Sequence, residues 1–267
     1  MSILNSILLG LVEGITEFIP VSSTGHMLLA QRLLGIPATD SMFAFLVLIQ
    51  LGALAALLVY FWSDFWRLIK AFFARPFSSE PNRMAWFILL ATLPALLAGV
   101  LLRDAVHGLF GKPLMEAAIR FFTAAAMLSL AESIGGRSRV LSSMTWPDAL
   151  IIGLFQVLSV FPGASRSGMA IGGGMLRNFH RESATRFAFL MSAPVMIAAG
   201  AYETMGAMSQ GGMAELLPAL LVGALVAGVA GWLSIRWLIN YVGRHRLYAF
   251  AGYCAAVGVL CLLLQRT

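Results

Sequence analysis

Two glutamates are the strongest candidates for chemistry in this sequence, because of their residue type and their spacing. Glu13 and Glu17 are four residues apart, a spacing that stacks both carboxylates on one face of a helix. Neighbouring carboxylates repel each other, and a divalent cation between them would relieve that repulsion. Oxygen ligands suit Mg²⁺ or Ca²⁺, so we predict that both glutamates bind such a cation and act in catalysis. The alternative is a solvated pair at the membrane surface.

Polar residues follow immediately after Pro20. Proline cannot continue a helix interior, so one helix should end before it, while Ser22, Ser23 and Thr24 are N-cap types that begin another. A helix start presents free N–H groups and partial positive charge, which suit phosphate. We predict that Ser22 and Thr24 bind phosphate, and that Ser23 and His26 are catalytic, with His26 as proton carrier or nucleophile. Plain capping and a structural histidine are the alternatives.

A second polar group lies far along the chain, at residues 165–168. Arg166 is the only cation between residues 149 and 176, and a guanidinium pairs bidentately with phosphate. Ser165, Ser167 and Gly168 surround it and allow hydroxyl and backbone groups to approach an anion. We predict that Arg166 is catalytic and that its three neighbours bind substrate. An ion-paired or snorkelling arginine is the alternative.

The composition places these residues in a membrane. Of 267 residues, 60% are hydrophobic and 11% are charged, whereas average soluble domains carry about 25% charged residues. A bilayer can cover so much apolar surface, because lipid is itself an apolar solvent. The net charge is +6, but the basic residues lie in short loops between apolar stretches. This pattern indicates topology and contact with lipid headgroups, and no nucleic-acid partner is predicted.

The fold class that follows is an all-α polytopic membrane protein forming one domain over residues 1–267. Residues 3–34 and 148–176 are apolar but broken midway by Pro, Gly and Ser, which is typical of re-entrant pairs of half-helices. About six further segments are long and apolar enough to span the bilayer: residues 43–62, 84–102, 115–132, 183–205, 216–236 and 248–265.

The two broken regions resemble each other. Residues 10–18 align without gaps on 153–161, and the following polar positions match as well. Three spans separate the two regions, and an odd number reverses orientation. The halves, approximately 1–132 and 148–267, are therefore predicted to form an inverted repeat whose broken regions meet near the midplane.

Basic residues also predict the orientation in the membrane. The loops near 63–83, 133–147, 177–182 and 236–247 hold most of the arginines and lysines and fall on one side of the predicted bundle. The positive-inside rule makes that side cytoplasmic. Both termini should then lie outside, and the first broken region should enter from outside.

Other polar and small residues predict packing. Glu116 and Arg120 are four apart near the end of a span and should form an ion pair. Gly223, Ala227 and Gly231 recur every four residues, which predicts a close-packed helix seam.

The stretches 13–26 and 162–168 resemble the two signature motifs of the bacterial undecaprenyl-pyrophosphate phosphatase family, and the resemblance covers essentially the whole chain. It implies hydrolysis of undecaprenyl pyrophosphate to the monophosphate plus inorganic phosphate, which recycles the carrier lipid of peptidoglycan synthesis. It also implies an inner-membrane location, a divalent metal, a site facing the periplasm or exterior, and bacitracin resistance. The residues that match the family's motifs are Glu13, Glu17, Ser23, Thr24, His26, Ser165 and Arg166.

Several alternatives stay open at this point. A secondary transporter or lipid flippase also uses inverted repeats and broken helices, whereas a scaffold would leave the buried charges unexplained. Another lipid phosphatase class carries S-R-x₅-H, but Gly172 stands where that histidine would be. The nucleophile is Ser23, His26 or water. Membrane lipids are expected partners beside the substrate, and the oligomeric state is open, a homodimer included.

Overall fold

The computed structural model describes residues 1–37, 39–102, 113–160, 164–210 and 213–265. Regular structure in these ranges is helical, apart from one isolated β-bridge between Arg139 and Phe179. The elements are α1 Ile3–Phe18, α2 Ser23–Leu33, α3 Asp40–Tyr60, α4 Trp62–Phe72, α5 Glu80–Leu101, α7 Pro113–Ile134, η1 Leu141–Ser143, α8 Trp146–Val157, η2 Leu158–Val160, α9 Arg166–Leu176, α10 Arg181–Gln210, α11 Met213–Val242 and α12 Tyr248–Leu264.

The predicted all-α polytopic membrane fold is confirmed, with fewer full spans than the six predicted. Among the described residues, four helices (α5, α7, α10 and α11) are long and apolar enough to cross a bilayer. A fifth span comes from α3, which meets this criterion together with α4 across a bend of 77°. The sixth predicted segment forms α12, which has 17 residues, at the lower end of what a bilayer requires. The loop predicted near 63–83 was wrong in part, because α4 occupies its first half.

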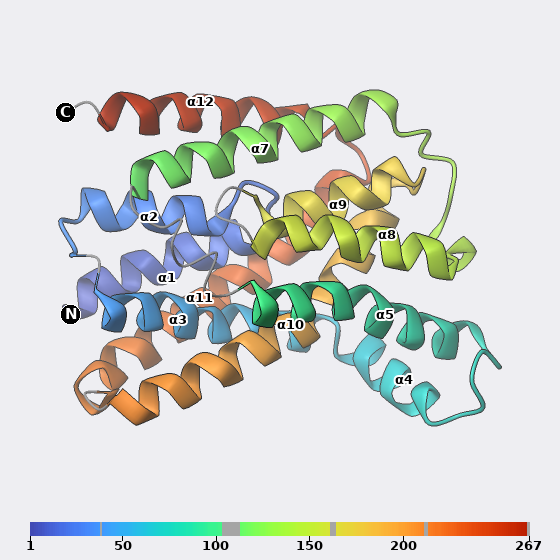
Figure 1. Cartoon of the computed structure of the whole chain (residues 1–267), viewed down its shortest axis with the longest axis horizontal. Coiled ribbons are helices and arrows are strands. Elements are labelled where there is room, and N and C mark those ends of the chain that lie inside the picture. Colours follow the sequence, from blue (N-terminus) through green and yellow to red (C-terminus); the bar gives the residue numbers. More distant parts are fainter. Residues whose placement is uncertain (38, 103–112, 161–163, 211–212, 266–267) are drawn as a thin grey trace.

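The two broken regions fold as helical hairpins, α1 with α2 and α8 with α9. In the first hairpin, α1 ends at Phe18, before Pro20, and the Ser22 side chain caps α2 by accepting from the Gly25 N–H. Figure 1 shows the hairpins entering the molecule from opposite ends, with their tips meeting near its middle. This is the arrangement expected of an inverted repeat.

Helix α1 lies directly against α11 along the predicted seam of small residues. A Cβ added at Gly10 would come within 2.5 Å of the Gly223 carbonyl oxygen, and one at Gly14 within 2.5 Å of that of Ala227. Only glycine permits so close an approach of two helix backbones. The prediction of a close-packed seam is therefore confirmed, and its partner is the helix that carries Glu13 and Glu17.

Two buried carboxylates bind arginines at one end of the molecule, opposite the end at which α1 begins (Figure 1). Glu132 accepts from Arg137 and Arg181, and Asp148 accepts from Arg139 and Arg177. In Figure 1, α1 begins and α12 ends together at the other end. The structure thus places the start of α1 and the end of α12 on one side and these arginine clusters on the other (Figure 1).

Candidate active site

The tips of the two hairpins meet through an ion pair between Glu17 and Arg166. These residues are 149 positions apart in the sequence. Glu17 is on the last turn of α1, and Arg166 is the first residue of α9. The glutamate side chain is 4% exposed and the arginine side chain 23%, so the guanidinium stays partly accessible while the carboxylate is enclosed.

Ser23 completes the environment of the Glu17 carboxylate. Its Oγ donates a hydrogen bond of 2.6 Å to Glu17 Oε2, while Arg166 binds Oε1. Ser23 is the first residue of α2, so its hydroxyl lies at the positive end of that helix. Carboxylate, guanidinium and hydroxyl are thereby joined in one chain of contacts at the hairpin tips.

Ser22 stands immediately before this helix and has an unusual backbone. Its φ of 68° lies in the left-handed region, which is uncommon for a residue with a side chain. The Ser22 Oγ accepts from the Gly25 N–H at 3.4 Å, which fits the capping alternative. Thr24 occupies the second position of α2 and is half-buried.

The second motif contributes capping and a link between the tips. The Ser165 side chain caps α9 by accepting from the Gly168 N–H at 3.3 Å. The Ser167 Oγ donates to the Ile19 carbonyl oxygen of the first hairpin at 3.4 Å. Pro162 and Gly163, which begin the motif, lie outside the described residues.

Glu13 is the least satisfied polar group near the site. Its side chain is fully buried, and neither carboxylate oxygen has a hydrogen-bond partner among the residues that the structure describes. Repulsion from Glu17 and attraction from Arg166 both act on it. A buried carboxylate without a partner is costly, and a cation would satisfy it.

The donor set fits a cation that takes its remaining ligands from elsewhere. Within the described part of the chain, no three His, Cys, Asp or Glu side chains are grouped to hold a metal. Mg²⁺ is commonly bound by one or two carboxylates, with water and substrate phosphates completing its shell. The pair Glu13 and Glu17 therefore suits a cation shared with a phosphate substrate rather than a closed structural site.

His26 is held by contacts to both ring nitrogens. Its Nδ1 lies 2.9 Å from the Ser22 carbonyl oxygen, and its Nε2 lies 2.8 Å from the Tyr253 hydroxyl. Phe121 packs edge-on against the imidazole with ring centroids 4.8 Å apart. Sequence reasoning missed Tyr253, because a tyrosine on the apolar helix α12 carries no motif and only folding brings it to His26.

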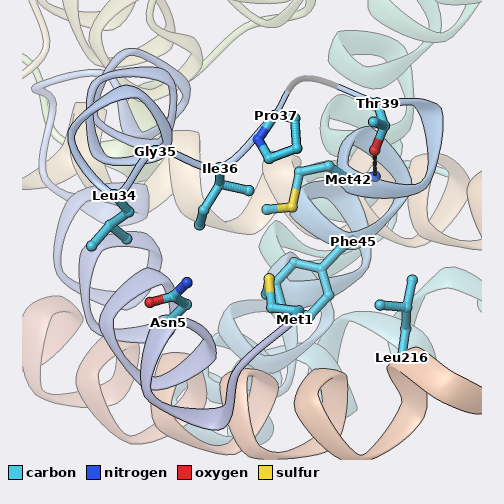
Figure 2. Close-up of a pocket in the computed structure, with 10 residues that line it drawn as sticks. All are labelled: Met1, Asn5, Leu34, Gly35, Ile36, Pro37, Thr39, Met42, Phe45 and Leu216. Atoms are coloured by element: carbon cyan, nitrogen blue, oxygen red, sulfur yellow. Dashed lines mark hydrogen bonds between the residues drawn. The ribbon is translucent and has the colours of Figure 1, made fainter.

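A pocket of about 320 Å³ lies at the other end of the first hairpin. Figure 2 shows Asn5 beside apolar side chains, among them Met42 and Phe45. Asn5 precedes Glu17 by twelve residues, about 18 Å along α1. This mainly apolar pocket is therefore separate from the ion pair at the tips and contains none of the predicted site residues.

Comparison with known proteins identifies the family to which these motifs belong. The model of the family described as "Bacitracin resistance protein BacA" matches residues 6–260. The chain belongs to this family. The match includes both hairpins and the helices that pack against them, so the geometry described above is that of a BacA family member.

Relatives of this BacA family member are similar along nearly their whole length. An undecaprenyl-diphosphatase of Myxococcus xanthus is 38% identical over 100% of this chain and 90% of its own length. Undecaprenyl-diphosphatase 1 of Corynebacterium jeikeium is 38% identical, covering 100% and 96%. An undecaprenyl-diphosphatase of Anaeromyxobacter sp. (strain K) is 40% identical, covering 97% and 90%.

Proposed function

We propose that this chain is an undecaprenyl-diphosphatase that hydrolyses undecaprenyl pyrophosphate to undecaprenyl phosphate and inorganic phosphate. Its family membership and the names of its relatives support this reaction. The observation that carries it in the structure is the contact of Glu17, Ser23 and Arg166 at the hairpin tips. A water-soluble phosphate ester would not require this cluster within an apolar bundle, whereas a lipid pyrophosphate would. The reaction returns the carrier lipid to peptidoglycan synthesis.

Arg166 is the residue that we assign to the terminal phosphate. A guanidinium has five donors, so contact with Glu17 leaves most of them available to a phosphate. The pyrophosphate would approach Arg166 from its exposed side, while Glu17 keeps the guanidinium oriented. Ser165, Ser167, Thr24 and the backbone at Gly168 are proposed to hold the remaining phosphate oxygens.

Ser23 is the proposed nucleophile, with Glu17 placed to accept its proton. The hydrogen bond of 2.6 Å already points from the Ser23 hydroxyl to Glu17 Oε2, which is the contact that a general base requires. The Ser23 Oγ–P bond would form as the P–O bond to the lipid monophosphate breaks. Water would then release inorganic phosphate from Ser23. Rapid quench distinguishes the nucleophiles. Phosphate trapped on Ser23 supports this route, phosphate trapped on His26 indicates attack by His26, and no trapped phosphate indicates direct attack by water.

His26 is proposed to move a proton at Nε2. The Ser22 carbonyl oxygen can only accept, so Nδ1 carries the hydrogen, and the lone pair of neutral Nε2 accepts from Tyr253. Ser22 thus fixes the tautomer of His26, and Tyr253 would hold its Nε2 in one orientation. The Ser23 hydroxyl donates its hydrogen bond to Glu17 rather than to His26. We therefore assign His26 to proton transfer with the leaving group or the attacking water.

Glu13 and Glu17 are the residues that would hold Mg²⁺ or Ca²⁺. Such a cation, when bound, neutralises charge on the pyrophosphate oxygens. We also propose that the chain resides in the bacterial inner membrane with both termini outside. The arginine clusters at the opposite end would be cytoplasmic, and the first hairpin would open the site to the exterior.

Phosphate release by the purified chain in detergent tests the function. We expect inorganic phosphate to appear from an isoprenyl pyrophosphate, to stop on addition of a chelator, and to resume on addition of Mg²⁺ or Ca²⁺. Release that persists unchanged in excess chelator would contradict the cation assignment alone. A transporter or flippase would release no phosphate in detergent, and that result would overturn the proposed reaction itself.

A further inference from the structure

Helix α4 plays no part in the site and is unusual in its placement. It follows α3 after a single residue, and the two helix axes differ by 77°. None of its residues is buried. Helix α3 has 21 residues, enough to cross a bilayer by itself, so a helix bent so sharply at its end runs along the membrane surface rather than through it.

One side of α4 carries an exposed apolar stripe. Trp62, Trp66 and Ile69, with Phe73 as the residue that caps the end of α4, follow one another at intervals of four, three and four residues, which places them on one face. Their exposure runs from 50% for Trp66 to 82% for Phe73. Phe65 and Leu68 pack against the protein core instead, so the stripe faces away from the protein.

Basic side chains flank this stripe. Arg67 and Lys70 are exposed, and the Lys70 ammonium lies 4.9 Å from the centroid of the Trp66 ring. The acidic residue of this helix, Asp64, forms a salt bridge with Arg186, whose Nη2 lies 2.7 Å from the Asp64 Oδ1. The charge that α4 presents outward is therefore positive.

Both ends of α4 are tied to the helical bundle. The Asp64–Arg186 pair attaches its first turn to α10. At the other end, the Asn82 side chain of α5 donates to the Ala71 carbonyl oxygen at 2.6 Å, and Phe72 contacts the Trp86 ring. Figure 1 shows α4 beside α5, at the end of the molecule opposite the chain termini. The surface is thus held in place without any partner.

We propose that the exposed face of α4 binds anionic phospholipid headgroups at the membrane surface. Tryptophan and phenylalanine suit the boundary between headgroups and acyl chains, and lysine and arginine beside them attract acidic lipids. Charge complementarity favours an anionic over a zwitterionic lipid. This proposal concerns a surface remote from Glu17 and Arg166 and stands independently of the reaction.

Brominated phospholipids provide the test, because bromine quenches nearby tryptophan fluorescence. The full chain in detergent would be mixed with brominated phosphatidylglycerol or brominated phosphatidylcholine. The signal of Trp62 and Trp66 is isolated by subtracting that of the Trp62→Phe/Trp66→Phe variant. We expect phosphatidylglycerol to quench at lower concentration, and Arg67→Gln/Lys70→Gln to weaken that binding about five-fold per charge removed.

A matched control removes two charges elsewhere. Arg244→Gln/Arg246→Gln lowers the net charge equally but alters the connection between α11 and α12. It should keep the preference for phosphatidylglycerol, and both double variants should release phosphate at the wild-type rate. Equal quenching by the two lipids, or equal loss in both double variants, would overturn the proposal. Absence of quenching by either lipid would also overturn it and indicate that another protein surface covers α4.

Discussion

Glu17 is the residue through which the two halves of the chain act together. One carboxylate oxygen binds Arg166 from the second hairpin, and the other binds Ser23 from the first. Both carboxylate oxygens therefore have partners, as a buried polar group requires. Loss of any member of this trio leaves another buried polar group without its partner.

Arg166 offers the sharpest test at this scale. Arg166→Ala should lower turnover by about a hundred- to a thousand-fold, because removing a donor to the transferred phosphate has effects of this size. Arg166→Lys should retain part of the activity, since lysine keeps the charge but loses the planar fork. Turnover and KM for isoprenyl pyrophosphate are the measurements. Near-normal turnover of Arg166→Ala would mean that the phosphate binds elsewhere.

Tyr253 can be tested by removing only its hydroxyl. Tyr253→Phe should lower turnover about tenfold, the effect of losing one hydrogen bond, with KM little changed. Nitrogen NMR of labelled histidine should then show a shifted Nε2 resonance at His26, because its lone pair loses a hydrogen-bond donor while the Ser22 carbonyl keeps the hydrogen on Nδ1. Tyr248→Phe, on the same helix, is the control. An unchanged Nε2 resonance in Tyr253→Phe would mean that the tyrosine does not orient His26.

At the scale of helices, α7 holds the second motif in place. The predicted ion pair of Glu116 and Arg120 is confirmed at 2.9 Å, and both side chains are buried. Arg120 also donates to the Ala164 carbonyl oxygen at 3.3 Å. Ala164 directly precedes Ser165, whose side chain caps α9. The guanidinium of Arg120 on α7 therefore positions the segment that leads to Arg166.

The two roles of Arg120 can be separated. Arg120→Leu should destabilise the protein by about 3–5 kcal/mol, because it leaves the buried Glu116 unpaired. The double variant Glu116→Leu/Arg120→Leu should recover most of that stability but not the turnover, since the contact to Ala164 stays lost. Thermal unfolding and phosphate release are measured on both variants. Full activity in the double variant would show that the Ala164 contact is dispensable.

Over the whole molecule, buried carboxylates join the ends of helices opposite the chain termini. Glu132 on α7 binds Arg181 on α10 and accepts from the backbone N–H of Leu247, just before α12. Asp148 on α8 binds Arg139 and Arg177. Each of these buried carboxylates connects several helix ends at once, and the ionic clusters hold that side of the bundle together.

Asp148 should therefore be far more important to stability than an exposed acid. Asp148→Asn is expected to destabilise the protein by about 3 kcal/mol, because it leaves two arginines without their buried partner. Asp64→Asn breaks a more exposed pair with Arg186 and should change stability by at most about 1 kcal/mol. The thermal unfolding midpoints of both variants are compared in one detergent. Equal midpoints would contradict this account.

The sequence by itself determined the membrane class, the helical fold, the broken regions and the residues of the cluster. These properties depend on local composition and spacing: Pro20, followed by the cap residue Ser22, marks a helix end, and Glu13 and Glu17 share a face in any helix. Proline alone does not decide this, because Pro94, Pro194 and Pro218 lie within α5, α10 and α11. The internal repeat also predicted a long-range feature, namely that the two hairpins meet. All six predicted spans fold as helices, but length and hydropathy did not reveal the bend after Tyr60 that separates α4 from α3.

Only the tertiary structure decided which partner each polar group has. Ser23 contacts Glu17 rather than His26, Tyr253 binds His26, Arg120 reaches Ala164, and Glu13 is left without a described partner. Each of these facts joins or isolates residues on different elements or segments of the chain. Their separation in space depends on how helices pack, and helix packing is set by the whole bundle rather than by the few residues around any one side chain.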